Sequence, residues 1–313
     1  MVSQYDAFLG RLIQALFEIK PDIVSLSEKT FTFAELLAFG SIEAAKNHLI
    51  EKEVETVLRD SHIEQFKWLE IKFGVQLRKG LDSWPQFVET TERRNLLVHT
   101  GGHVSSQYIK NCKDQNVVLD DTIKSGIELD TNSQYVTKAY ECLFEIGVKL
   151  AHVLWRKLDA KSREKADANL NHIAYELIVE GKYGLAASIL ELATSEMFKK
   201  GCSDLHMRTF LINKAQAYKW MGNDDKMNQI LQSEDWSASR NDFQLANTVL
   251  KGDYVRAAHI MKKISNRQDA EIKRHDYSDW PLFQEFIKSN EFLDAHLEVY
   301  GQPFVEITDG EGE

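Results

Sequence analysis

Three side chains suited to acid–base chemistry at a phosphate lie close together in the stretch Glu92–Gly102. Arg94, Asn95 and His99 fall within six positions, and no other arginine in the chain has a histidine five residues later. Histidine transfers protons near neutral pH, and arginine holds an anion through parallel N–H donors. Cleavage of a phosphodiester needs both abilities, so these residues are the first candidates for a functional site.

The candidate residues are predicted to lie near the end of a helix. Apolar or small side chains recur at spacings of three and four before and within the stretch, at Trp84, Phe87, Val88, Thr91 and Val98, as on one face of a helix. Pro85 suits a first helical turn, and Gly101-Gly102 is a typical stop. Asn95 and His99 then share a face. Arg94 lies beside it, roughly 7.5 Å from His99 along the axis.

The run Arg94-Asn95-Leu96-Leu97-Val98-His99 resembles the signature of HEPN-domain ribonucleases: an arginine, a polar residue and then a histidine. The resemblance implies a helical bundle in which two motif helices meet across a homodimer and cleave RNA without a metal or another cofactor. It implies His99 as general acid or base and Arg94 as the phosphate holder. Asn95 would orient His99 or the ribose. Similar proteins often serve as toxins or in defence against phage.

Further substrate contacts are predicted at Arg93 and His103, which flank the motif. Each candidate also has an ordinary interpretation. A histidine in a last helical turn suits the helix dipole, and Arg93 can belong to a solvated basic face. That face would comprise Lys67, Lys72, Arg78, Lys79, Arg93 and Arg94. A thiol nucleophile at Cys112 is a weaker alternative, because no orienting signature surrounds it. The sequence shows no metal-ligand spacing and no phosphate-binding glycine loop, so no metal is expected.

Composition favours an all-α protein. The chain has 313 residues, 43% of them hydrophobic, and only four prolines, which argues for helix throughout. Its net charge is −10, with more acidic than basic residues in each half, so neither half is a basic nucleic-acid module. Three scattered cysteines, no long apolar run and no basic leader predict a reduced, cytoplasmic protein without a membrane span.

Two domains are expected. Residues 1–158 read as a HEPN-like helical domain and residues 159–168 as a linker or a helix continuation. Residues 169–303 read as helical repeats, and residues 304–313 as an acidic, disordered tail. Within the first domain, helices are expected over residues 5–19, 32–39, 42–73 with a bend near Ser61, 84–100, 105–109 and 133–158, with a short hairpin in 115–132.

The repeats are recognised by turns at Gly181, Gly222, Gly252 and Asn290, each followed five positions later by a small or soft residue and nine positions later by an aliphatic one. The pattern resembles a degenerate tetratricopeptide array, although a generic set of helical hairpins is the alternative. Such arrays usually bind other proteins. The leading hypothesis is therefore a dimeric, metal-independent endoribonuclease whose repeats bind a protein partner. The alternative is a non-catalytic, dimeric interaction protein, in which the HEPN-like bundle only forms the dimer and the repeats bind a protein partner.

Overall fold

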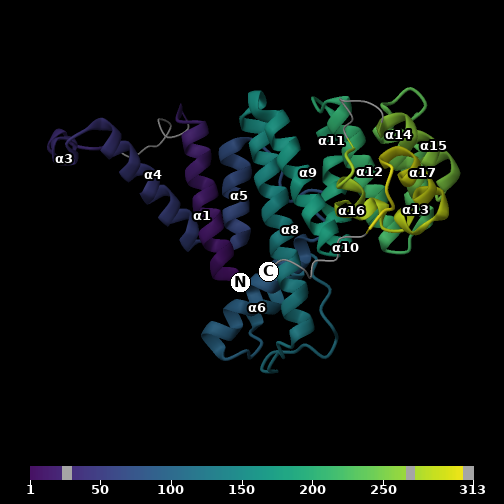
Figure 1. Ribbon diagram of the computed structural model, residues 1–313. Helices are drawn as coiled ribbons and strands as arrows, with labels where there is room; N and C mark the ends of the chain where they lie inside the picture. The colour runs from purple at the N-terminus through teal and green to yellow at the C-terminus, as the bar shows by residue number, and fades with distance from the viewer. Residues whose placement is uncertain (23–29, 266–271, 306–313) are drawn as a thin grey trace, which may run out of the picture. The chain divides into compact units, whose positions relative to one another are not determined.

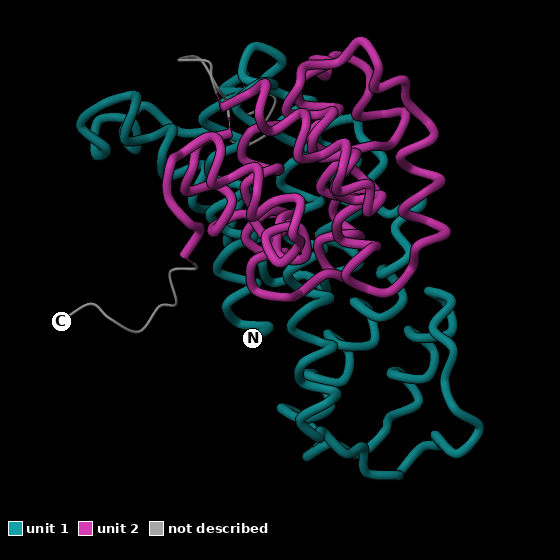
Figure 2. The backbone as a smooth tube through the Cα atoms, turned by 45° about the vertical axis from the view of Figure 1, so that its right-hand side comes forward, with its two compact units in different colours: residues 1–166 teal, residues 167–313 magenta. Residues whose placement is uncertain are grey.

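A computed structural model describes residues 1–22, 30–265 and 272–305 (Figure 1). The all-α prediction is confirmed: 73% of the chain is helical, with sixteen α-helices and no strand in the described ranges. The chain divides into two compact units, residues 1–166 and 167–313 (Figure 2). The division falls inside 159–168, where a 3₁₀ turn, Ala160–Ser162, leads directly into α9, Arg163–Val179. The segment predicted as an acidic tail lies mostly outside the described residues.

Unit 1 consists of seven described helices before α9. They are α1 (Val2–Ile19), α3 (Phe33–Phe39), α4 (Ile42–Arg59), α5 (His62–Phe73), α6 (Trp84–Thr100), α7 (Ser106–Asp114) and α8 (Ser133–Leu158). Helix α1 packs against α4 and α8, and α6 packs against α5, α7 and α8. Their shared core contains large side chains such as Phe17, Phe66 and Phe87. Because α1, α5 and α6 meet through this core, polar residues at their edges can share one cavity.

Local signals in the sequence account for most helix ends in unit 1. Thr32 and Glu35 form the expected capping box at the start of α3. Ser61 caps the backbone N–H of Glu64 and so starts a new helix, which makes the predicted bend in residues 42–73 a complete break. This break is important for the site, because it places His62 at the first position of α5.

Two expectations for residues 105–132 were wrong. Helix α7 begins after the N-cap Ser105, as expected, but it continues to Asp114, five residues beyond the predicted end. Residues 115–132 contain no strand; the only β-type pairing among the described residues is an isolated bridge between His103 and Glu128. That bridge connects the segment to the loop that follows α6.

Unit 2 is built from helical hairpins. Helices α10 (Tyr183–Ala193), α11 (Glu196–Lys199), α12 (Asp204–Trp220), α13 (Asp224–Gln232), α14 (Asn241–Leu250), α15 (Tyr254–Ser265), α16 (Asp276–Asp279) and α17 (Asn290–Tyr300) follow α9. Helix α12 packs on α10, α13 and α14, and α15 packs on α14 and α17. The residues five positions after each turn, Ala186, Met227, Ala257 and Ala295, are all buried. Small side chains there allow neighbouring helices to approach closely.

Three of the four aligned turns share one backbone conformation. Gly181, Gly222 and Gly252 have φ angles of 73°, 72° and 74°, the left-handed region that glycine adopts without steric cost. The fourth position differs, because Ser289 caps α17 and Asn290 is already helical. The stretch before it consists of two 3₁₀ turns, Pro281–Phe283 and Phe286–Lys288, rather than an α-helix. The sequence pattern therefore overstated the similarity of the fourth hairpin to the others.

Candidate functional site

The motif lies at the carboxyl end of α6, and backbone hydrogen bonds fix the position of that helix end. Gly101 and Gly102 have φ angles of 60° and 87°, and the N–H of Gly102 donates to the carbonyl of Leu96. The loop is also tied to the segment before α8, since Leu129 donates to the Gly102 carbonyl and Val104 to that of Ile127. These hydrogen bonds fix the backbone of the last turn of α6, and with it the position of the His99 Cα atom.

Arg94, Asn95 and His99 line one cavity of about 530 Å³ in unit 1. Asn95 accepts a hydrogen bond from Nη1 of Arg94 at 3.1 Å, so the two neighbouring side chains are held together. His99 is exposed, as its position in the last turn predicts. The volume lies in the range of sites that hold a nucleotide-sized ligand. The structure therefore brings together the three residues that the motif singled out.

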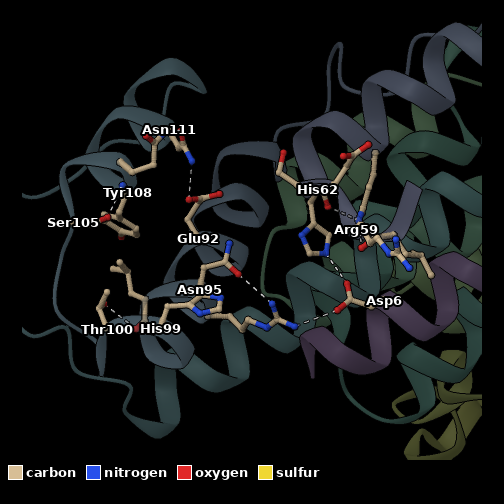
Figure 3. Close-up of a pocket in the computed structure, with 17 residues that line it drawn as sticks. Asp6, Arg59, His62, Glu92, Asn95, His99, Thr100, Ser105, Tyr108 and Asn111 are labelled. Carbon is tan, nitrogen blue, oxygen red and sulfur yellow. Dashed lines mark hydrogen bonds and ion pairs between the residues drawn. The ribbon is translucent and has the colours of Figure 1, made fainter. Parts of the chain in front are cut away.

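The opposite wall of the cavity comes from helices far away in the sequence (Figure 3). Asp6 of α1 lies 3.4 Å from Nη2 of Arg94 and 2.8 Å from Nε2 of His62, and each of its oxygens serves one partner. Arg59, at the end of α4, lines the same wall. The cavity consequently contains two arginines and two histidines, although the motif supplied one of each.

Glu92 is a further polar residue on the α6 wall. Its side chain is buried and accepts a hydrogen bond from Asn111 of α7 at 2.9 Å. It precedes Asn95 by three positions and His99 by seven, so all three follow one face of the helix. Glu92 was not predicted as a site residue, although its spacing from Asn95 and His99 is visible in the sequence. Asp6 and His62 carried no comparable local signal.

Arg93 and Arg94 are adjacent but have different environments. Arg93 does not line the cavity; it pairs with Glu89 at 2.7 Å, donates to the carbonyl of Asp130 and stacks on the ring of Tyr135 at 4.1 Å. Glu89 also accepts hydrogen bonds from the hydroxyls of Tyr108 and Tyr135. Burial, with Glu89 nearby, raises the pKa of Tyr108 well above its usual range, so it remains a donor. Arg93 thus belongs to a packed network beneath the motif.

The other sequence candidates lie outside the cavity. His103 is exposed, and its ring Nδ1 lies 3.0 Å from the carbonyl oxygen of Thr100. Most of the predicted basic face is paired with carboxylates: Lys67 with Glu64, Lys72 with Glu53, Arg78 with Glu70. The Lys67–Glu64 pair is exposed, as on a solvated helix surface, whereas the other two pairs are mostly buried. Of the basic residues named for that face, Arg94 lines the cavity.

The thiol alternative finds no support in the environment of Cys112. The side chain is fully buried, and burial raises its pKa to about 12. A nucleophilic cysteine needs the opposite conditions, an accessible and electropositive site that favours the thiolate. Among the described residues, no three histidine, cysteine or carboxylate side chains gather in a way that could hold a metal ion.

The described helices include none that is long and apolar enough to cross a membrane. A scan against protein-family models found no match to this chain, and searches of curated proteins and of solved structures found none either. The residues and the geometry of the cavity are therefore the basis for assigning a function.

Proposed function

We propose that unit 1 is a metal-independent endoribonuclease domain and that the cavity between α1, α5 and α6 is its active site. The observation that carries the proposal is that Arg94, Asn95 and His99 line one cavity together. The HEPN-type motif supports the same reaction. In this proposal His99 transfers a proton and Arg94 binds the scissile phosphate, because its guanidinium is permanently charged. Asn95 holds Arg94 in place.

The proposed reaction is attack by the ribose 2′-oxygen on the neighbouring phosphorus. A base removes the 2′-hydroxyl proton, the 2′-O–P bond forms, and the P–O5′ bond breaks as an acid protonates the leaving oxygen. The products are a 2′,3′-cyclic phosphate end and a 5′-hydroxyl end. Arg94 would stabilise the negative charge that builds on the phosphate oxygens.

The Arg94–Asp6 ion pair is compatible with such a role. Its atoms are 3.4 Å apart, and both side chains are about one third exposed, so the pair contributes little stability. A phosphate can therefore compete with Asp6 for the guanidinium at small cost. Asp6, Asp60 and Glu92 also place negative charge around the cavity. This charge disfavours tight binding of RNA, and we expect weak affinity with a shallow dependence on salt, because few phosphates are neutralised.

The test is RNA cleavage by the full-length chain and by two variants, His99→Ala and Arg94→Ala. Each variant is expected to lose 10²- to 10⁴-fold in rate, as on removal of a general acid or base or of a charge-stabilising donor. Cleavage should persist in EDTA and leave cyclic phosphate or 3′-phosphate ends. Equal cleavage with alanine at position 99, or cleavage only with added Mg²⁺, would contradict the mechanism.

The proposal extends to a homodimer through unit 1, to a protein partner on the repeats and to a role as toxin or phage-defence effector, all from the resemblance. A second candidate function is favoured by a groove of about 350 Å³ in unit 2. Its lining combines Lys199, Lys214 and Lys226 with Glu191 and Glu234, and Lys214 pairs with Glu191, so a polar protein segment with charges of both signs would suit it. If the wild-type chain cleaves no RNA, with or without a partner, this interaction role becomes the better proposal.

A further inference from the structure

His62 is a second histidine in the proposed active site, and the motif did not indicate it. RNA cleavage by 2′-oxygen attack needs one group that removes a proton and another that supplies one. The motif contains a single histidine per chain, so a site built from the motif alone would need a second chain to complete it. The structure places His62 and His99 in the same cavity of one chain. The inference below rests on the proposed function and concerns how its two proton transfers are divided.

The imidazole of His62 has a fixed orientation. The residue follows the N-cap Ser61 and is the first residue of α5. Its ring packs against Tyr5 and Phe87, with ring centroids 6.0 and 5.6 Å away. The side chain is only 11% exposed. Such packing on aromatic rings leaves the ring little freedom to rotate, so each ring nitrogen has a constant direction.

Asp6 determines which nitrogen of His62 carries the proton. Its Oδ1 atom lies 2.8 Å from Nε2, and an ionised carboxylate can only accept hydrogen bonds. In the neutral imidazole Nε2 therefore carries the hydrogen, and Nδ1 keeps a lone pair that can accept a proton. Figure 3 shows Nε2 directed at Asp6 and the other nitrogen turned toward the side of the cavity with Asn95 and His99. A carboxylate in this position also stabilises the imidazolium that forms when the base accepts a proton.

Arg94 connects the two walls. Its guanidinium reaches Asp6 on the His62 side and Asn95 on the His99 side. A phosphate bound at this guanidinium would lie between the two imidazoles. That position matches the reaction, since the 2′-oxygen enters and the 5′-oxygen leaves on opposite sides of the phosphorus.

We propose that His62, oriented by Asp6, is the general base of this site, and that His99 is the general acid. Nδ1 of His62 takes the 2′-hydroxyl proton as the 2′-O–P bond forms. The P–O5′ bond breaks, and the imidazolium of His99 gives its proton to the departing 5′-oxygen. One proton is taken up and one is given, so the step is balanced without a metal or another reagent. Each chain then contains a complete acid–base pair.

The experiment compares His62→Gln, His99→Ala and the wild type on two substrates. One is ordinary RNA, and the other is a nucleoside 3′-(4-nitrophenyl phosphate), whose leaving group needs no acid. Glutamine retains an N–H donor for Asp6 but supplies no base. We expect His62→Gln to lose 10²- to 10⁴-fold on both substrates. His99→Ala should be impaired on RNA and recover most of its rate on the activated substrate.

His48→Gln is the matched control. His48 is also helical and packs near an aromatic ring, that of Phe39 at 5.0 Å, but it does not line the cavity. Its variant should retain the wild-type rate. If His99→Ala is inactive on RNA while His62→Gln stays within about threefold of wild type, the inference fails and the proposed function stands. Recovery of His62→Gln on the activated substrate would also overturn the base assignment. A wild-type chain that cleaves neither substrate overturns both proposals.

A second measurement covers the case in which His62→Gln does not fold. Wild-type protein labelled with ¹⁵N-histidine is titrated with a 2′-deoxy dinucleotide, which binds but lacks the attacking hydroxyl. The ring signals of His62 and His99 should both move, while those of His48 stay in place. Movement of the His99 signals without those of His62 would overturn the inference.

Discussion

Asp6 Oδ1 and His62 Nε2 lie 2.8 Å apart and link the first helix of the chain to the start of α5. Asp6 uses its other oxygen for Arg94 of α6, so one carboxylate contacts both walls of the cavity. Removal of this carboxylate should affect the histidine and the arginine together. The arrangement makes Asp6 a positioning residue for the proposed reaction.

Asp6→Asn should reduce the rate of RNA cleavage by about 10²-fold or more, because the amide no longer fixes the His62 tautomer or stabilises its imidazolium. The fold should persist, since Asp6 lies at the cavity edge and is partly exposed. Cleavage rates and thermal unfolding curves check both expectations. Glu18→Gln, an exposed change on the same helix, is the control. An Asp6→Asn enzyme with the wild-type rate and pH profile would remove Asp6 from the mechanism.

The adjacent arginines should differ in the property that each controls. Arg94→Ala is expected to lower the cleavage rate by about 10²- to 10⁴-fold and to change stability little. Arg93→Ala should instead lower the free energy of unfolding by about 2 kcal/mol, because it breaks a largely buried ion pair with Glu89. Urea unfolding and cleavage assays on both variants test the contrast. A large loss of stability in Arg94→Ala would refute this division of roles.

Mixing two inactive variants tells whether one site draws on one chain or two. If His62 and His99 of the same chain act together, a mixture of His62→Gln and His99→Ala should stay inactive after subunit exchange. If the two histidines come from different chains of a dimer, about a quarter of the wild-type activity should return, because half of the dimers are mixed and each has one intact site. Light scattering on the same samples reports whether a dimer forms. The two variants mixed without time for exchange serve as the control.

The stability of unit 2 should depend on pH through His296. The side chain is fully buried, its Nδ1 contacts the Gln302 carbonyl at 3.1 Å, and Nε2 has no hydrogen-bond partner. Burial lowers the pKa of His296 below its usual value, so the unfolded chain binds the proton more readily than the folded one. Stability should therefore be lost as the pH falls below about 6.5. The urea midpoint of His296→Asn should vary less with pH than that of the wild type, whereas His172→Asn, an exposed control, should not differ from it.

The turn at Gly222 has room for a larger side chain, but its backbone conformation disfavours residues other than glycine. A Cβ atom there would meet no atom within 4 Å, but the φ angle is 72°. Gly222→Ala is therefore expected to cost about 1–2 kcal/mol through backbone strain rather than through a clash. Gly222→Asn should cost less, because asparagine adopts this conformation more readily. Thermal unfolding of both variants checks the order; an equal loss in both would point to another cause.

Short-range patterns predicted much of unit 1. The bounds of α6, its glycine stop and the capping box of α3 all depend on residues within one or two turns of each other, and the structure confirms them. The exposure of Val98 was not predicted, because Val98 has the same spacing as the buried apolar positions of the helix. In the structure Val98 lies beyond the core, and Leu96 is buried instead. The three- and four-residue spacing of apolar side chains does not show at which residue a helix stops packing against its neighbours.

The second wall of the cavity was not predictable from local pattern. Asp6 and His62 are 56 positions apart, and Asp6 and Arg94 are 88 apart. Their contacts depend on how α1, α5 and α6 pack, and hydrophobic periodicity gives the buried face of a helix but not its neighbour. A motif with one histidine per chain favours a dimer, because the second chain would supply the other proton-transfer group. With His62 in the same cavity, one chain can supply both groups, and the expected dimer rests on the motif resemblance alone.

The 88 positions between Asp6 and Arg94 also set an order of events during translation. The ribosome produces α1 and α5 first, and these carry Asp6 and His62. His99 follows much later, and the α7 wall is complete only at Asn111. A nascent chain that ends before His99 lacks the motif histidine, and one that ends before Asn111 lacks part of the α7 wall. If the cavity cleaves RNA as proposed, the activity appears only once the chain up to Asn111, about two thirds of unit 1, has left the ribosome. The messenger being read would thus be protected from its own product during most of the synthesis of that unit.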